Sequence, residues 1–160
     1  MKEEIIKLCS ELVERLQKRG LTISLAESCT GGLAAAYLVS VPSASCVFNS
    51  SFVTYSNSSK CKYLGVNEET IASVGVVSEA VACQMARGTA LANCAEVGVG
   101  ITGIAGPTGG TNEKPVGTVC FGFYIDGELF CETAHFENMD RNSVREASCE
   151  FVFSQLCKML

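Results

Sequence analysis

Segments typical of β-strands alternate with segments typical of helices along most of this chain. Residues 3–18 carry apolar side chains at helical spacing, and residues 21–26 then alternate apolar and polar side chains like a strand. A glycine-rich turn leads from this strand into an alanine-rich segment, 33–41, that favours a helix. The alternation predicts an α/β fold, because strands of this kind must be covered by helices.

The chain continues in the same manner to its end. Asn67 and Ser78 are placed to cap two further helices, and Asp140 or Asn142 to cap the last one. Periodicity and turn residues predict strands at 47–55 and 97–102, a polar turn at 56–59 before a short helical segment carrying Lys60, and helices at 68–73, 79–93 and from about 141 to 160.

A β-hairpin is the clearest local pattern in the second half of the chain. Large apolar residues stand at every second position from 119 to 125, Asp126 and Gly127 suit a type I′ turn, and residues 128–136 return. At least one strand is therefore antiparallel. We expect a three-layer α/β/α sandwich around a mixed, mainly parallel sheet, in one domain that covers residues 1–160.

The composition excludes several classes of protein. Apolar residues make up 48% of the chain and charged residues 18%, which excludes intrinsic disorder. No apolar run reaches bilayer length and the first residues favour an amphipathic helix, so we expect a cytoplasmic protein without a membrane partner. A net charge of −5 argues against a nucleic-acid partner, although a small anion can still bind where cations gather.

The chain contains 10 cysteines, an unusual number for a cytoplasmic protein. None stands in a Cys-x-x-Cys pair, and Cys9 and Cys149 fall on apolar faces of predicted helices. We interpret most of them as reduced structural thiols, with a metal site or disulfide network as the alternative. Cys120 and Cys131 are diagonal neighbours in the predicted hairpin, too far apart for a disulfide.

Two familiar cofactor motifs can be set aside. The only histidine, His135, falls in the returning hairpin strand, where we expect it to be exposed or hydrogen-bonded rather than a metal ligand. The glycines of residues 98–103 match a dinucleotide fingerprint as text, but the first of them lie inside a strand and no helix follows. We therefore expect neither a metal nor a cofactor.

The turn at residues 27–32 is the best candidate for an active site. Ser28 stands where a strand turns into a helix, which exposes a small nucleophile, and the following glycines let a ligand approach backbone N–H groups. The alternative is that Ser28 or Thr30 caps the next helix.

A serine nucleophile needs a base, and the chain offers no suitable histidine. Lys60 follows the next strand, so it reaches the same edge of the sheet as Ser28 if the two strands run parallel. Its amine acts as a base only where burial or a neighbouring cation lowers the pKa. The alternative is a solvated surface lysine.

Five segments resemble motifs of the CinA C-terminal domain family, the nicotinamide mononucleotide deamidases. They occur in the order and spacing of that family: residues 26–33 (AESCTGGL), 54–57 (TYSN), 77–79 (VSE), 102–107 (TGIAGP) and 113–119 (EKPVGTV). The resemblance implies hydrolysis of the carboxamide of this nucleotide to nicotinate mononucleotide and ammonia, with no metal or cofactor. It also implies a homodimer.

The resemblance further implies roles for individual residues. Ser28 matches the nucleophile and Lys60 the base of an acyl transfer, with Tyr55 beside them. Backbone N–H groups near Gly31, Gly32 or residues 103–106 are the expected oxyanion donors. Arg141, or Lys114, is expected to hold the phosphate. The implied substrate-binding set is Thr30, Gly31, Gly32, Thr102, Gly103, Gly106 and Arg141.

The chain departs from the family pattern at three places. Ser58 and Ser59 replace a Glu-Ala pair before the lysine, Ser51 replaces a glycine, and the stretch 136–141 has gained a residue. Two other hypotheses stay open: a nucleotide-binding module without catalysis, and Cys29 as the nucleophile, because a helix N-terminus lowers a thiol pKa.

Overall fold

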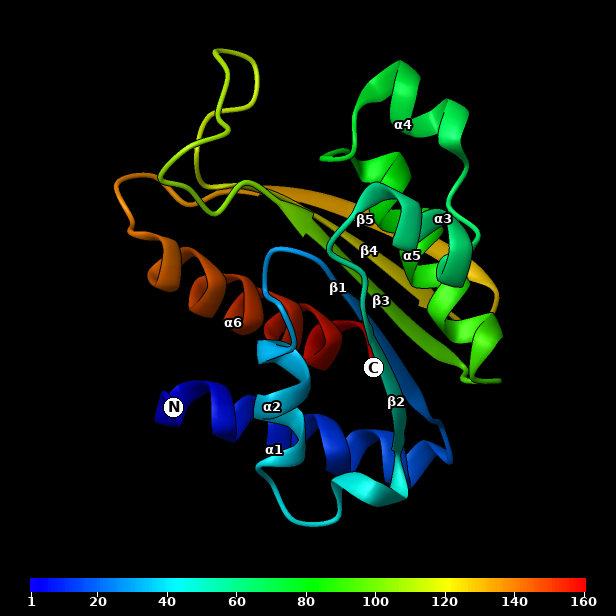
Figure 1. Ribbon diagram of the computed structural model, residues 1–160. Helices are drawn as coiled ribbons and strands as arrows, with labels where there is room; N and C mark the ends of the chain where they lie inside the picture. Colours follow the sequence, from blue (N-terminus) through cyan, green and yellow to red (C-terminus); the bar gives the residue numbers. More distant parts are fainter.

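The computed structural model describes residues 1–160 and is built around a five-stranded sheet (Figure 1). The strands are β1 (Ile23–Glu27), β2 (Phe48–Val53), β3 (Val97–Gly103), β4 (Thr118–Ile125) and β5 (Glu128–His135). They lie in the order β2-β1-β3-β4-β5. β1 is parallel to β2 and β3, and β4 is antiparallel to β3 and β5. Four strands therefore share one direction, which confirms the mixed, mainly parallel sheet.

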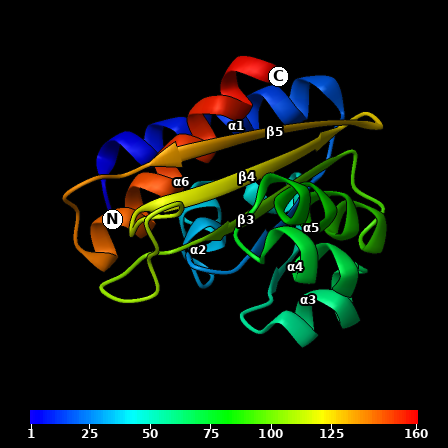
Figure 2. The ribbon, with the colours of Figure 1, turned by 90° about the horizontal axis from the view of Figure 1, so that it is seen from above.

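Helices cover both faces of the sheet (Figure 2). They are α1 (Glu3–Arg19), α2 (Leu33–Val39), α3 (Asn57–Leu64), α4 (Glu68–Val74), α5 (Glu79–Ala92) and α6 (Arg141–Met159), with a 3-10 helix, η1, at Ala44–Cys46. Helices α1, α2 and α6 lie on one face, and α5 lies on the other with α3 and α4 packed against it. The predicted three layers are confirmed, and no helix is long and apolar enough to span a bilayer.

Helix starts follow the predicted caps. The side chains of Asn67, Ser78 and Asp140 each accept a backbone N–H of the helix that follows. Asp140, rather than Asn142, therefore caps α6. The polar turn expected at 56–59 is wrong, because Ser56 Oγ accepts the N–H of Ser59 and starts α3 there.

Glycines in β3 and β4 let α5 pack closely on the sheet. A Cβ atom at Gly98 would collide with the carbonyl of Ala86, and one at Gly100 or Gly122 with the carbonyl of Ala82. These glycines therefore serve helix–sheet contact. Residues 98–103 all lie within β3 and a loop follows them, so the helix that a dinucleotide fingerprint requires is missing, as predicted.

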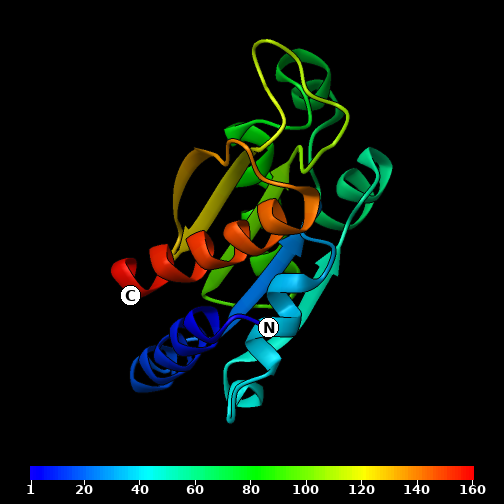
Figure 3. The same cartoon turned by 90° about the vertical axis from the view of Figure 1, so that its left-hand side faces the viewer.

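One end of the sheet gathers the loops that form the site. The parallel strands β1, β2 and β3 all end there, and in Figures 1 and 3 the long loop 104–117 stands at the same end as α4. The Nζ atom of Lys114 in this loop donates to the carbonyl of Val74 at 2.7 Å. The loop 104–117 and α4 therefore stand together over the ends of these strands.

Candidate active site

Ser28 and Lys60 lie side by side where β1 and β2 end. Glu27 of β1 pairs with Val53 of β2, so the residues after these strands emerge together. Helix α3 then turns Lys60 back toward β1, and its Nζ lies 2.9 Å from Ser28 Oγ. The two residues expected at one sheet edge are therefore in contact.

The amine of Lys60 is buried among polar backbone atoms. The residue is only 1% exposed, and Nζ donates to the carbonyls of Thr54 at 2.6 Å and Tyr55 at 3.4 Å. No carboxylate forms an ion pair with it. Burial lowers the pKa of the Lys60 amine below its ordinary value of 10.5. The alternative of a solvated surface lysine is wrong.

Glu27 shapes the turn that carries Ser28. Its carboxylate accepts hydrogen bonds at 2.9–3.1 Å from three backbone N–H groups, those of Gly32, Ala34 and Ala35. Gly31, which has a positive φ like Gly32, donates its N–H to the carbonyl of Ser28. Because these N–H groups already have acceptors, an oxyanion donor near Gly31 and Gly32 must be another N–H group of the turn.

Helix α2 takes its cap from Glu27. The N-cap residue of α2 is Gly32, and neither the Ser28 nor the Thr30 side chain accepts an N–H of this helix. Thr30 is fully buried, and its hydroxyl has no hydrogen-bond partner. The capping alternative for Ser28 and Thr30 is therefore wrong, and the Ser28 hydroxyl is left to Lys60.

Several backbone N–H groups around Ser28 donate to no carbonyl of the protein. Those of Cys29, Thr30, Ala105 and Gly106 are among them. Cys29 and Ala105 line a cavity of about 190 Å³ together with Ser28. The donors available to a ligand therefore include those that directly follow Ser28 and those of the loop after β3.

The cavity beside Ser28 adjoins a larger one. The first is lined by Ser28, Cys29, Tyr55, Asn57, Val76, Val77, Thr102, Gly103, Ala105 and Arg141. The second has a volume of about 440 Å³, shares Arg141 with the first, and adds Gly106 and Lys114. The site therefore has a small end at Ser28 and a larger end with two cationic side chains.

Arg141 contacts two of the other expected residues despite the altered stretch before it. Its guanidinium donates to the carbonyl of Gly106 at 2.7 Å and to the hydroxyl of Tyr55 at 2.8 Å. Thr102 lines the cavity, but its hydroxyl donates to the carbonyl of Val76 at 3.0 Å. Thr102 thus holds the segment before α5 against the sheet.

Two residues of the site were not singled out from the sequence. Glu27 lies inside the recognised motif, and counting the N–H groups of the glycine turn that need acceptors could have revealed its role. Arg145 of α6 donates from Nη2 to the carbonyl of Thr30 at 2.8 Å. No local sequence pattern predicts this contact, because Arg145 and Thr30 are far apart in the chain.

The Cys29 thiol lies in an environment that suppresses its ionisation. Burial raises its pKa to about 12, and the negative charge of Glu27 acts in the same direction. The low pKa expected for Cys29 from its position before a helix is therefore wrong. All ten cysteines are free, and no group of three or more His, Cys, Asp or Glu side chains could hold a metal ion.

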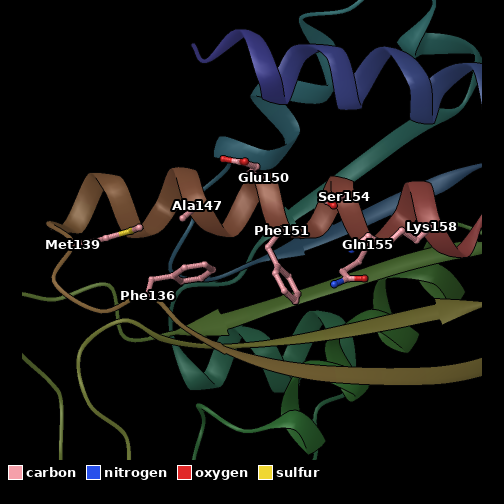
Figure 4. A pocket seen from close by; sticks show the side chains of 8 residues that line it. All are labelled: Phe136, Met139, Ala147, Glu150, Phe151, Ser154, Gln155 and Lys158. Atoms are coloured by element: carbon pink, nitrogen blue, oxygen red, sulfur yellow. The ribbon is translucent and has the colours of Figure 1, made fainter.

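Another hollow, of about 380 Å³, lies on α6 away from this site (Figure 4). It is lined by Phe136, Met139, Ala147, Glu150, Phe151, Ser154, Gln155 and Lys158. His135, just before it, is exposed, and its Nδ1 lies 3.2 Å from the Thr118 hydroxyl. No hydrogen bond joins Ser154 of this hollow to Glu150 or Lys158, whereas Lys60 contacts Ser28, so the Ser28 cavity remains the candidate active site.

Comparisons with known proteins agree on one family. The model of the CinA C-terminal domain matches residues 5–160. A CinA-like protein from Kosmotoga olearia is 48% identical over 88% of this chain and 34% of its own length. A putative competence-damage inducible protein from Halothermothrix orenii is 43% identical over 99% of this chain and 38% of its own. The chain thus spans about a third of these relatives.

Solved structures share the fold closely. A competence/damage inducible protein from Agrobacterium tumefaciens superimposes with a TM-score of 0.94 at 36% identity, over 98% of this chain and 95% of that one. A CinA superfamily protein from Escherichia coli gives a TM-score of 0.94 at 34% identity, over 100% of this chain and 94% of that one.

The buried thiol predicts a clear labelling pattern. With iodoacetamide at neutral pH, the exposed Cys46 and Cys94 should react and Cys29 should stay unmodified, because the thiolate is the reactive form. Peptide mass spectrometry of the folded protein measures each site. Modification of Cys29 as fast as Cys46 would show that its thiol is accessible and ionised.

Proposed function

The chain belongs to the CinA C-terminal domain family, and from this membership and the contact between Ser28 and Lys60 we propose that it is an amidohydrolase. Its proposed reaction converts nicotinamide mononucleotide to nicotinate mononucleotide and ammonia. The observation that carries the proposal is the buried Lys60 amine, 2.9 Å from the hydroxyl of Ser28 and without a carboxylate partner.

The surroundings of Lys60 suit a neutral amine. A neutral amine has two N–H donors and one lone pair. The carbonyls of Thr54 and Tyr55 can accept the two donors, which turns the lone pair toward the Ser28 hydroxyl. In this state Lys60 accepts the proton that Ser28 must lose to become a nucleophile.

The reaction is an acyl transfer in two halves. Ser28 Oγ attacks the carboxamide carbon while Lys60 takes its proton, and the N–H groups of Cys29 and Thr30 donate to the developing oxyanion. The C–N bond breaks as Lys60 returns the proton to the leaving ammonia. Water then attacks the acyl-enzyme, gives a proton to Lys60, and releases the acid as Ser28 regains a proton.

The larger cavity suits the ribose phosphate of the substrate. Its two cationic side chains, Arg141 and Lys114, match a phosphate in charge. Arg141 also fixes the hydroxyl of Tyr55 at the border of the smaller cavity. The nucleotide would thus lie with its carboxamide at Ser28 and its phosphate toward these cations.

Substitutions of the two reacting residues test the proposal directly. Ser28→Ala and Lys60→Ala should each lower kcat for ammonia release from nicotinamide mononucleotide by at least about a thousandfold, because the nucleophile and base act as a unit. Ser58→Ala and Lys62→Ala are matched controls on exposed positions of α3 and should keep wild-type rates.

Two results would contradict this account. Undiminished turnover by Ser28→Ala would remove the serine from the mechanism. Binding of the mononucleotide by the wild-type protein without ammonia release would favour a nucleotide-binding module over an enzyme.

The pH dependence of the rate tests the protonation state of Lys60. Only the neutral amine accepts a proton, so kcat/KM should rise with pH through the lowered pKa of Lys60 and level off below 10.5. Steady-state rates between about pH 6 and about pH 10 measure the profile. A rate independent of pH across this range would argue against Lys60 as the base.

A further inference from the structure

Glu27 is a fully buried carboxylate without a cationic partner. It is 0% exposed, and no lysine, arginine or histidine forms an ion pair with it. A buried charge of this kind is costly unless hydrogen bonds replace the lost water. The three N–H groups of Gly32, Ala34 and Ala35 provide that replacement, and they all lie beyond the turn that starts at Ser28.

The backbone on either side of Glu27 is fixed to neighbouring strands. The carbonyl of Glu27 accepts the N–H of Thr54, and the N–H of Ser28 donates to the carbonyl of Ile101 at 3.0 Å. The start of the turn is therefore held by β2 and β3. The far end of the turn is held by two side chains. Glu27 accepts its N–H groups, and Arg145 donates to the carbonyl of Thr30.

We propose that Glu27 is a positioning residue for Ser28. By binding the N–H groups beyond Gly31, its carboxylate closes the turn so that Ser28 Oγ stays at Lys60 Nζ and the N–H groups of Cys29 and Thr30 stay available. The inference rests on the proposed function for its catalytic consequence. Glu27 itself lines neither cavity, so its role is to position Ser28 rather than to contact the substrate.

The geometry requires a carboxylate of this length. One oxygen of Glu27 accepts from Ala35, and the other accepts from Gly32 and Ala34. A glutamine has one acceptor oxygen, so its NH2 group would face at least one of these donors in either orientation. An aspartate lacks one methylene group and cannot reach all three N–H groups without moving the turn.

The expected defect is in kcat rather than in binding. Glu27 lines neither cavity, whereas Arg141 and Lys114 lie at the end proposed for the phosphate. Displacement of a reacting group by about 1 Å costs about a hundredfold in rate. Loss of the carboxylate should therefore lower kcat by about that factor, with KM within about threefold of wild type.

The test compares Glu27→Gln with the same change at a partly exposed carboxylate beyond the opposite end of β1. Glu96 accepts from the N–H of Thr22 at 2.8 Å and from its hydroxyl at 2.9 Å, far from Ser28 in the sheet. Ammonia release gives kcat and KM, thermal unfolding gives Tm, and intact mass follows labelling of Ser28 by phenylmethanesulfonyl fluoride. Glu27→Gln should lose kcat and label slowly, whereas Glu96→Gln should keep both at wild-type values.

A folded Glu27→Gln protein with wild-type kcat and labelling rate would overturn the inference. So would equal losses in Glu27→Gln and Glu96→Gln that simply follow Tm. If Glu27→Gln does not fold, Glu27→Asp decides by the same readouts, with an intermediate loss of kcat supporting the role and unchanged kcat refuting it.

The labelling arm separates this inference from the proposed function. Phenylmethanesulfonyl fluoride reports the reactivity of Ser28 without the nucleotide. If wild-type protein releases no ammonia but labels at Ser28 faster than Glu27→Gln, the deamidase proposal fails and the positioning role stands.

Discussion

The buried contact between the Lys60 amine and the Ser28 hydroxyl is the interaction around which this site is organised. A charged lysine in such a place would be costly, and burial lowers its pKa accordingly. The carbonyls of Thr54 and Tyr55 satisfy the amine without an opposing carboxylate. The fold thus holds a basic nitrogen beside a hydroxyl and leaves it no stable ion pair.

That contact depends on the parallel pairing of β1 and β2. Because both strands end at the same edge, the turn after β1 and the helix after β2 begin as neighbours. Ser56 starts α3 directly after β2, so Lys60 lies about one turn into the helix and points back. Arg141 and the loop after β3 then close the remaining side of the cavity.

Much of this arrangement could be predicted from local patterns. Strand and helix periodicity placed Ser28 and Lys60 at strand ends, and a shared direction of β1 and β2 brings such ends together. The ionisation of Cys29 could not be predicted. Its position before a helix favours a low thiol pKa, but its burial, which only the fold shows, has the larger effect and raises the pKa.

The oxyanion donors and the contact between Arg145 and the Thr30 carbonyl were harder to predict from the sequence. Gly31 and Gly32 look available in the sequence, but Glu27 and the carbonyl of Ser28 occupy their N–H groups. Arg145 and Thr30 are 115 residues apart in the sequence, and helical periodicity in α6 does not specify their contact. Such features arise from how the turn closes in three dimensions.

The central claim is tested most directly by a crystal structure of Ser28→Ala bound to nicotinamide mononucleotide. The account predicts the carboxamide carbon about 3 Å from the position that Ser28 Oγ occupies, with the phosphate toward Arg141 and Lys114. A nucleotide bound with its carboxamide away from Ser28 and Lys60 would contradict it.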